Sequence, residues 1–520
     1  MALNTAIFSA ATGLSRIAGL VREIVAATYF GTTGPASAFT LAFQIPNLIR
    51  ALVADAALSS AFVPVFSDLL EHKRRREALQ LASTLAGLLL VALGAIALLF
   101  IFLAPVVIPV FTGDEFTPEL DALTAGLSQV LFPIIVLLGL NGLAVGILNA
   151  HDEFTIPAIA PLVWNVVIIA GLVLLTPLFE GDDRIYAYAI GVVAGTLVQL
   201  LMTVPSLRRL GFPVWHFRLP RRDDLLVRRV LVLMLPVSVG LGLINIDLVL
   251  NSMIGSLVSD EAPAAIDKAF RVYMLPQGMF SVAVATVVFP QLSRLASRRD
   301  LGQMRVVLGV GMRQIAFLLI PAAAAIVVLG RPIVEVLYQR GEFDAGSTDL
   351  VTEALAAFCI SLPFSGWNLI LTRTFFSLQK PWLPTVLALG SLVVNVAVSL
   401  ALYGIGVAGV VLGTVVSNVV LTVLLAYRLR GELGGLELPR LLRSVAVMLL
   451  AAAALAGAAW AVHTALDDLL GNGLIGQIVA LGAGLITGGA VYAAIVLALR
   501  LPEARQILEL LRGRLGRGSS

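Results

Sequence analysis

Charged residues are scarce in this chain of 520 residues. Asp, Glu, Lys and Arg together make up 13% of it, whereas hydrophobic residues make up 59%. Soluble globular domains carry about 25% charged residues, so half that share cannot cover a molecule of this size with polar groups. The mean hydropathy of +0.98 agrees. The composition excludes a cytosolic enzyme, a disordered chain and a nucleic-acid-binding protein, and it predicts an integral membrane protein.

Cysteine and clustered histidine are also lacking. Cys359 is the only cysteine, which excludes an intrachain disulfide and a metal site built from several cysteines. The four histidines are scattered and form no ligand cluster, so we expect neither a metal nor another cofactor. Aromatic residues amount to 7%, so the apolar excess is aliphatic, as lipid-facing helices require. No basic leader precedes Arg16, and we expect the first helix to be retained rather than cleaved.

Long apolar runs dominate what is present. A membrane-spanning helix needs about 20 mainly apolar residues, and a helix satisfies its own backbone hydrogen-bonding groups in hydrocarbon. The run 381–427 is long enough for two helices, divided near 403–406. The sequence therefore predicts an all-α membrane protein with 14 transmembrane helices: 3–30, 36–68, 78–113, 122–150, 155–179, 185–207, 226–256, 263–295, 304–338, 350–376, two in 381–427, 444–466 and 469–499. The glycine-rich run 482–489 lies inside the last of these and is interpreted as a helix-packing surface, not a nucleotide loop.

Lys and Arg concentrate on one side of the predicted helices. The C-terminal tail and the segments after each even-numbered helix, counted with the adjoining ends of the flanking helices, carry 26 of the 35 Lys and Arg residues. The opposite loops carry only Arg184, Arg331 and Arg340. Because positively charged loops stay in the cytoplasm, we expect both termini to be cytoplasmic.

Two stretches of the sequence resemble each other across the middle of the chain. Pro46 and Pro64 in the second span have counterparts in Pro276 and Pro290 in the eighth. The separation in sequence from Pro46 to Pro276 differs from that between Pro64 and Pro290 by only about one helical turn. We therefore expect two six-helix lobes related by a pseudo-two-fold axis, which is the plan of a transporter with its substrate site between two bundles. The expected divisions are an N-terminal lobe at 1–222, a C-terminal lobe at 223–432, and helices 13 and 14 with the tail at 433–520.

Four of the arginines inside predicted helices are candidates for a substrate site: Arg16 and Arg22 in the first, Arg50 in the second and Arg271 in the eighth. An arginine near the bilayer centre costs about 2.5–3.5 kcal/mol on insertion scales, and such residues normally face a cavity. Guanidinium groups match phosphate and carboxylate oxygens. The set predicts a polyanionic substrate.

Nearby carboxylates offer a structural explanation instead, because they would neutralise these cations. The candidate pairs are Arg16–Glu23, Arg50–Asp55 and Arg271–Asp267. The last pair is spaced by four residues, which is a favourable spacing on one helix face. Arg313, near the inner end of the ninth helix, is interpreted as an anchor that snorkels to the membrane interface.

Several short stretches are distinctive: 15–23 (SRIAGLVRE), 30–31 (FG), 38–39 (AF), 42–50 (AFQIPNLIR) and 57–64 (ALSSAFVP), with Arg271 five residues before 276–278 (PQG). Together they resemble the MurJ (MviN) lipid II flippase family of the multidrug/oligosaccharidyl-lipid/polysaccharide exporter superfamily. The chain departs from that family at Ser37, where Asp is frequent, and at Asp55, where Glu is usual.

The resemblance implies a lipid II flippase of the bacterial cytoplasmic (inner) membrane, needed for peptidoglycan and cell-wall synthesis. Such a protein carries undecaprenyl-diphosphate-linked disaccharide-pentapeptide from the inner to the outer leaflet by alternating access. The family's essential cavity arginines match Arg16, Arg22, Arg50 and Arg271. Helices 13 and 14 would form a groove for the lipid tail. We expect a monomer in contact with membrane lipid, a transporter and not an enzyme.

Two ways of driving transport stay open at this point. Some family members have a sodium site, to which Asp247, Asn395 and Thr414 would correspond, but its second carboxylate falls on Ser399. The membrane potential is the other driving force. Two alternatives of the same superfamily also stay open, namely an exporter of another polyprenyl-linked glycan and a drug or cation antiporter.

Overall fold

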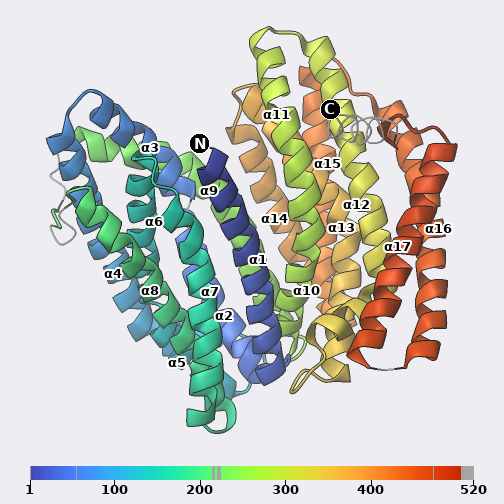
Figure 1. Cartoon of the computed structure of the whole chain (residues 1–520), viewed down its shortest axis with the longest axis horizontal. Coiled ribbons are helices and arrows are strands. Elements are labelled where there is room, and N and C mark those ends of the chain that lie inside the picture. The colour runs from blue at the N-terminus through green and yellow to red at the C-terminus, as the bar shows by residue number, and fades with distance from the viewer. Residues whose placement is uncertain (1, 54–55, 213–216, 220–223, 472, 505–520) are drawn as a thin grey trace. The chain divides into compact units, whose positions relative to one another are not determined.

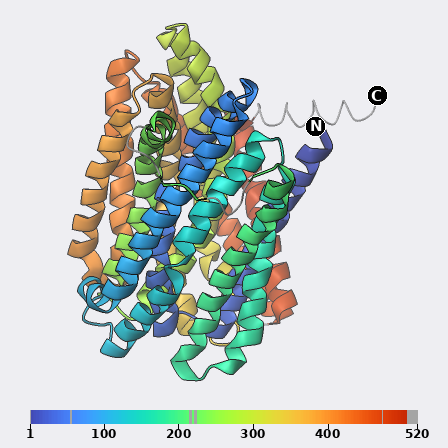
Figure 2. The same ribbon diagram turned by 90° about the vertical axis from the view of Figure 1, so that its left-hand side faces the viewer.

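A computed structural model of the chain describes residues 2–53, 56–212, 217–219, 224–471 and 473–504. Across these ranges the chain is almost entirely helical and contains no strand, which confirms the all-α prediction. Figure 2 shows the helices of the first part of the chain (blue to green) running side by side for most of their length.

The helices are labelled in Figure 1. The first set is α1 (Ala2–Phe30), α2 (Gly34–Val53), α3 (Ala56–Glu71), α4 (Arg75–Phe111), α5 (Pro118–Leu131), α6 (Ile134–Ala150), α7 (Thr155–Leu175), η1 (Thr176–Leu178), η2 (Gly181–Ile185), α8 (Tyr186–Arg209) and α9 (Leu225–Gly255). The second set is α10 (Ala262–Pro276), η3 (Gln277–Ser281), α11 (Val282–Ser297), α12 (Leu301–Tyr338), α13 (Ala345–Ser377), α14 (Trp382–Leu402), η4 (Tyr403–Ile405), α15 (Val407–Glu432), α16 (Leu438–Leu470) and α17 (Leu474–Ala498).

Eleven helical segments among the described residues are long and apolar enough to cross a membrane. Large apolar side chains on them face outward: Phe102 and Val110 on α4 are 77% and 75% exposed, and Ile475 and Ile486 on α17 are 80% and 75% exposed. Large apolar patches are rarely left in contact with water, so these faces meet lipid. The chain is a multi-pass membrane protein.

A helix lies over each of the fourteen predicted spans, and the division near 403–406 is confirmed, because α14 ends at Leu402 and α15 begins at Val407. Two spans predicted as single helices are interrupted instead. They correspond to α5–α6, with Pro133 between them, and to α10–α11, with the π-helical turn η3 between them. The span over α2–α3 includes residues 54–55, which lie outside the described residues. The spans over α1, α2–α3 and α9 are not among the eleven, so fourteen crossings stay a prediction.

Close contacts divide the chain into two compact units. The first comprises Met1–Ala264 with Arg340–Asp344, and the second comprises Ala265–Gln339 with Ala345–Ser520. Helix α9 belongs to the first unit, where Gln44 Nε2 on α2 donates a hydrogen bond to Ser252 Oγ at 2.7 Å. The predicted lobes at 1–222 and 223–432 were derived from the sequence repeat, whereas these units are defined by contacts. The lobes therefore stay a prediction.

Helix bounds recur along the chain at a nearly constant spacing. Helices α3 and α11 end at Glu71 and Ser297, and Pro64 and Pro290 each lie seven residues before the end of their helix. Helices α7 and α14 both have 21 residues, begin at 155 and 382, and are each followed by a three-residue 3-10 turn. The spacing found in the sequence therefore continues, to within a single position, through several elements.

The turns that follow α3 and α11 are alike as well. Lys73 and Arg299 have φ angles of 59° and 56°, in the left-handed region that often closes a helix. The next residue in each turn donates its N–H to the carbonyl five residues back: Arg74 to Leu69 at 2.8 Å and Asp300 to Leu295 at 3.0 Å. Matching turn geometry at matching positions supports the predicted internal repeat.

Helices α16 and α17 lie side by side (red in Figure 1). A Cβ atom at Gly484 would lie 2.8 Å from the carbonyl oxygen of Ala459, and one at Gly488 would lie 2.9 Å from Ala459 Cβ. Nothing lies within 4 Å of the corresponding positions at Gly482 and Gly489. The glycine-rich run therefore packs α17 against α16, which confirms the helix-packing interpretation.

Candidate functional site

Arg22, on α1 in the first unit, is a buried cation. Only 9% of the residue is exposed, its Nη2 donates to Glu23 Oε1 at 2.5 Å, and its guanidinium lies 4.8 Å from the centre of the Trp164 ring on α7. A carboxylate and an aromatic face both stabilise a desolvated guanidinium. Trp164 was not singled out from the sequence, because nothing local links it to α1.

Arg16 lies on the same helix but in different surroundings. Its side chain is exposed, and among the described residues it makes no hydrogen bond or ion pair. The pairing of Arg16 with Glu23 that the sequence suggested is wrong, because Glu23 binds Arg22, its neighbour in the chain. Arg16 therefore has no carboxylate partner among the described residues.

Arg50 contacts the amide group of Asn47, one helical turn earlier on α2. Its Nε and Nη2 donate to Asn47 Oδ1 at 3.0 and 2.7 Å, and Asn47 Nδ2 donates in turn to Asn245 Oδ1 on α9 at 3.2 Å. Asp55, the partner that the sequence suggested for Arg50, lies outside the described residues. Asn47 is one helical turn before Arg50, a spacing that the sequence displays, whereas the role of Asn245 depends on the packing of α2 against α9.

Arg271, on α10, forms the ion pair that its spacing suggested. Its Nε donates to Asp267 Oδ2 at 2.7 Å, and the side chains are 34% and 17% exposed. Lys268, on the preceding turn, is buried beside the ring of Tyr338, with its Nζ 5.7 Å from the ring centre. A guanidinium has five N–H donors, and the contact with Asp267 described here uses one of them.

The residues predicted for ion coupling divide between the two units. Asp247 is on α9 in the first unit, where Asn251 Nδ2 donates to its Oδ2 at 3.5 Å. In the second unit Asn395 and Ser399 on α14 lie together: Ser399 Oγ donates to Asn395 Oδ1 at 3.1 Å and to the Val410 carbonyl of α15 at 2.8 Å. Thr414 follows Gly413, whose Cβ position is 2.5 Å from Asn395 Oδ1. These oxygen-bearing side chains of the second unit are buried between α14 and α15, and the sodium site stays a prediction.

Arg313 is not a snorkelling anchor, and that interpretation is wrong. Its side chain is only 12% exposed, its Nε donates to Glu503 Oε1 at 2.6 Å, and its Nη1 donates to Glu437 Oε2 at 3.2 Å. One cation thus joins α12 to the start of α16 and to the segment that follows α17. No local sequence pattern contains this cluster, because the two partners are 124 and 190 residues away.

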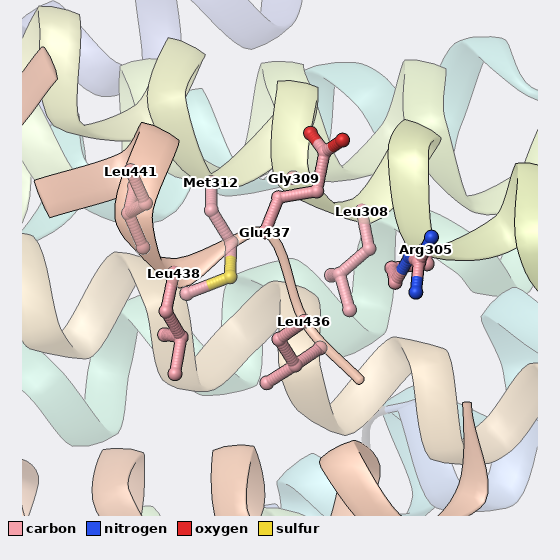
Figure 3. Close-up of a pocket in the computed structure, with 8 residues that line it drawn as sticks. All are labelled: Arg305, Leu308, Gly309, Met312, Leu436, Glu437, Leu438 and Leu441. Carbon is pink, nitrogen blue, oxygen red and sulfur yellow. The ribbon is translucent and has the colours of Figure 1, made fainter. Parts of the chain in front are cut away.

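A pocket lies beside this cluster, where α16 begins (Figure 3). It holds about 220 Å³ of empty space, part of it open to the surroundings. The residues that line it are Arg305, Leu308, Gly309 and Met312 of α12 with Leu436, Glu437, Leu438 and Leu441. None of the four predicted substrate-binding arginines is among them, so we regard it as a packing feature at this helix start.

The fold is similar to that of solved membrane proteins. The chain superposes on a solved structure described as "Lipid II flippase MurJ, inward closed conformation" with a TM-score of 0.78, 22% identity, and coverage of 95% of this chain and 99% of that one. It also superposes on an inward-facing MATE-family transporter of the MOP superfamily, with a TM-score of 0.69, 17% identity, and coverage of 81% and 94%. The fold is that of the membrane transporters of this superfamily.

Sequence comparison then narrows the class. Residues 26–481 match the family described as "Lipid II flippase MurJ". The chain is 32% identical over 450 residues to a probable lipid II flippase MurJ of Rhizobium meliloti, covering 84% of this chain and 83% of that protein. It is 31% identical over 392 residues to the lipid II flippase MurJ of Burkholderia cenocepacia, covering 74% and 75%. The chain belongs to the MurJ family of lipid II flippases, which are transporters and not enzymes.

Proposed function

We propose that this protein moves lipid II from the inner to the outer leaflet of the bacterial cytoplasmic membrane by alternating access, and so supplies peptidoglycan synthesis. The observation that carries the proposal is the family match over residues 26–481. The multi-pass helical fold and the cations within its helices agree with a carrier for an anionic lipid head group.

The proposed topology has fourteen crossings, two six-helix lobes and both termini in the cytoplasm. The recurring spacing between matching helices, α3 with α11 and α7 with α14, supports the lobes. The one-sided distribution of Lys and Arg supports the orientation. Helices α16 and α17 fall outside the repeat, and we propose that they accompany the prenyl tail while the protein works as a monomer.

The proposed ligands of the diphosphate and the acidic head group are Arg16, Arg22, Arg50 and Arg271. Charge-assisted hydrogen bonds from guanidinium to phosphate are short and strong. Glu23 and Asp267 hold two of these cations in place and would be displaced in part when the substrate arrives. Such competition favours release of the head group after transport, because the empty site has an internal partner for each of these two cations.

The driving force has two candidates. One is sodium, bound by Asp247 with Asn395 and Thr414, although Ser399 supplies a hydroxyl where a second carboxylate would bind the ion more strongly. The other is the membrane potential, worth about 2.3 kcal/mol per charge per 100 mV, which would draw an empty cationic site back toward the cytoplasm. Varying sodium and potential separately in vesicles distinguishes the two.

The test is complementation of a cell depleted of its own flippase, paired with an assay of lipid II in the outer leaflet. We expect growth and outer-leaflet lipid II to be restored together. Growth without lipid II in the outer leaflet would favour an exporter of another polyprenyl-linked glycan. Export of drugs or cations with neither effect would favour an antiporter of the same superfamily.

A further inference from the structure

Two connectors that correspond to each other in the predicted internal repeat have similar sequences and the same backbone turn. One is 112–117, between α4 and α5, and the other is Arg340–Asp344, between α12 and α13. Each contains a Glu-Phe pair shortly after a glycine, and Phe116 and Phe343 are 4% and 1% exposed. Each closes with the same turn: the N–H of Phe116 donates to the Gly113 carbonyl at 2.9 Å, and that of Phe343 to the Arg340 carbonyl at 3.1 Å. Both phenylalanines hold the same place relative to the next helix, since α5 begins at Pro118 and α13 at Ala345.

The second connector docks on the end of α1. The N–H of Glu342 donates to the Thr28 carbonyl at 2.9 Å. The backbones are so close that a Cβ at Gly341 would lie 2.2 Å from the Thr28 oxygen, and one at Gly31 would lie 2.4 Å from the Glu342 oxygen. Both glycines have positive φ angles, 61° and 54°. Arg184 Nη1 of η2 lies 3.9 Å from Glu342 Oε1. By its contacts this connector belongs to the first unit, although α12 and α13 belong to the second.

The first connector docks in the same way on the end of α9. The N–H of Gly113 donates to Ser256 Oγ at 3.0 Å. A Cβ at Gly113 would lie 2.7 Å from Leu257 Cα and 2.7 Å from the Ser256 carbonyl oxygen. Ser256 Oγ donates to the Met253 carbonyl at 2.6 Å, so its lone pairs are directed toward the connector.

The pairing is reciprocal. Helices α1 and α9 are the first helices of the two proposed lobes, and each receives the connector that follows the third span of the other lobe. All of the docking contacts lie within the first unit. The segments concerned, 28–31, 112–117, 184, 256–257 and 340–344, all fall on the side that Lys and Arg placement predicts to be outer.

We propose that the two connectors are a reciprocal pair of clasps that hold the outer ends of α1 and α9 while the outer side is closed, and that both must release before the substrate leaves outward. The proposal rests on the alternating-access function above. Glycine is required at both contacts because backbone approaches backbone there, and an added methyl group has no flexible side chain to displace.

The test adds that methyl group and measures local opening. In a Cys359→Ser background, Thr32→Cys is the reporter, since Thr32 follows Gly31 directly and is 0% exposed. Purified protein in lipid nanodiscs is treated with a polar maleimide. We expect Gly341→Ala and Gly113→Ala each to raise the labelling rate about tenfold, which corresponds to a modest shift in the closed–open equilibrium.

Matched controls exist on the same predicted side. Gly181→Ala places alanine at a positive φ of 53° with nothing within 4 Å, and Gly404→Ala places it at another outer turn with nothing within 4 Å. Labelling in the clasp variants at the rate of these controls would overturn the proposal. The clasp variants are also made with Cys359 kept and Thr32 unchanged; a tenfold rise in labelling of Cys359 there, which is 0% exposed, would show global unfolding and overturn the proposal too. Labelling needs no lipid II, so its result is separate from that of the flippase proposal.

A cross-link tests release directly and does not depend on tolerance of alanine. In the Cys359→Ser background, Thr28→Cys with Glu342→Cys is joined by a short cleavable bis-maleimide. We expect lipid II transport to stop and to return on cleavage. Transport at the uncross-linked rate with the clasp joined would show that release is not part of the cycle.

Discussion

At the scale of single residues, the sequence locates the cations but not all of their partners. Arg271–Asp267 follows from a spacing of four residues, and it was predicted. Glu23 was assigned to Arg16 on helix geometry, yet its partner is Arg22, because α1 packs beside Trp164 and draws that guanidinium inward. A sequence carries helix periodicity, but the side of a helix that a neighbour covers is decided by packing.

Replacing Arg271 by Ala should reduce lipid II transport at least about tenfold while the protein still inserts, since a missing charge-assisted contact of about 1.5–3 kcal/mol corresponds to that factor or more. Arg331→Ala is the matched control, because it removes another arginine paired four residues along a helix, with Glu335 at 2.9 Å, on the same unit. Outer-leaflet lipid II in complemented cells is the measurement. Equal transport by both variants would exclude Arg271 from the substrate site.

At the scale of helices, composition predicted where they lie and missed where they break. The interruptions at Pro133 and at Gln277–Ser281 both fall inside predicted spans, and membrane helices tolerate proline, so no change in hydropathy marks them. The attachment of α16 and α17 was missed as well, since Arg313, Glu437 and Glu503 come together only in the folded chain.

Replacing Arg313 by Met should lower the free energy of unfolding by about 3 kcal/mol, because two buried carboxylates lose their cation. Arg440→Ala is the control: Arg440 pairs with the same Glu437 but its side chain is 75% exposed, so its loss should cost less than about 1 kcal/mol. Thermal and denaturant unfolding in detergent measure both. Adding Glu503→Gln to Arg313→Met should recover part of the loss, and failure to recover any would argue against a charge effect.

At the scale of the whole molecule, the membrane class and the helix positions could be predicted from the sequence, because hydropathy is a property of the chain itself. The two related lobes stay a prediction. The resemblance in the first seventy residues pointed to the family that the full-length comparison shows. The docking of connectors on α1 and α9 was not foreseen, since polar turns of this kind carry no signal of what they contact.

The predicted orientation can be measured with the chain's single cysteine removed. In Cys359→Ser, we expect Asp182→Cys to react with an impermeant maleimide applied to intact cells, and His72→Cys to react only after the membrane is opened. Both positions are exposed, so access and not burial decides the result. Reaction at His72→Cys in intact cells would reverse the topology and place the two connectors in the cytoplasm.

The π-helical turn Gln277–Ser281 separates Arg271 from the rest of its membrane span. Such a turn accommodates one residue more than an α-helical turn does, and one residue corresponds to about 100° around a helix axis. The number of residues in this turn therefore sets the direction in which Arg271 points relative to α11. Deletion of one residue from this turn would rotate Arg271 by about 100° relative to α11.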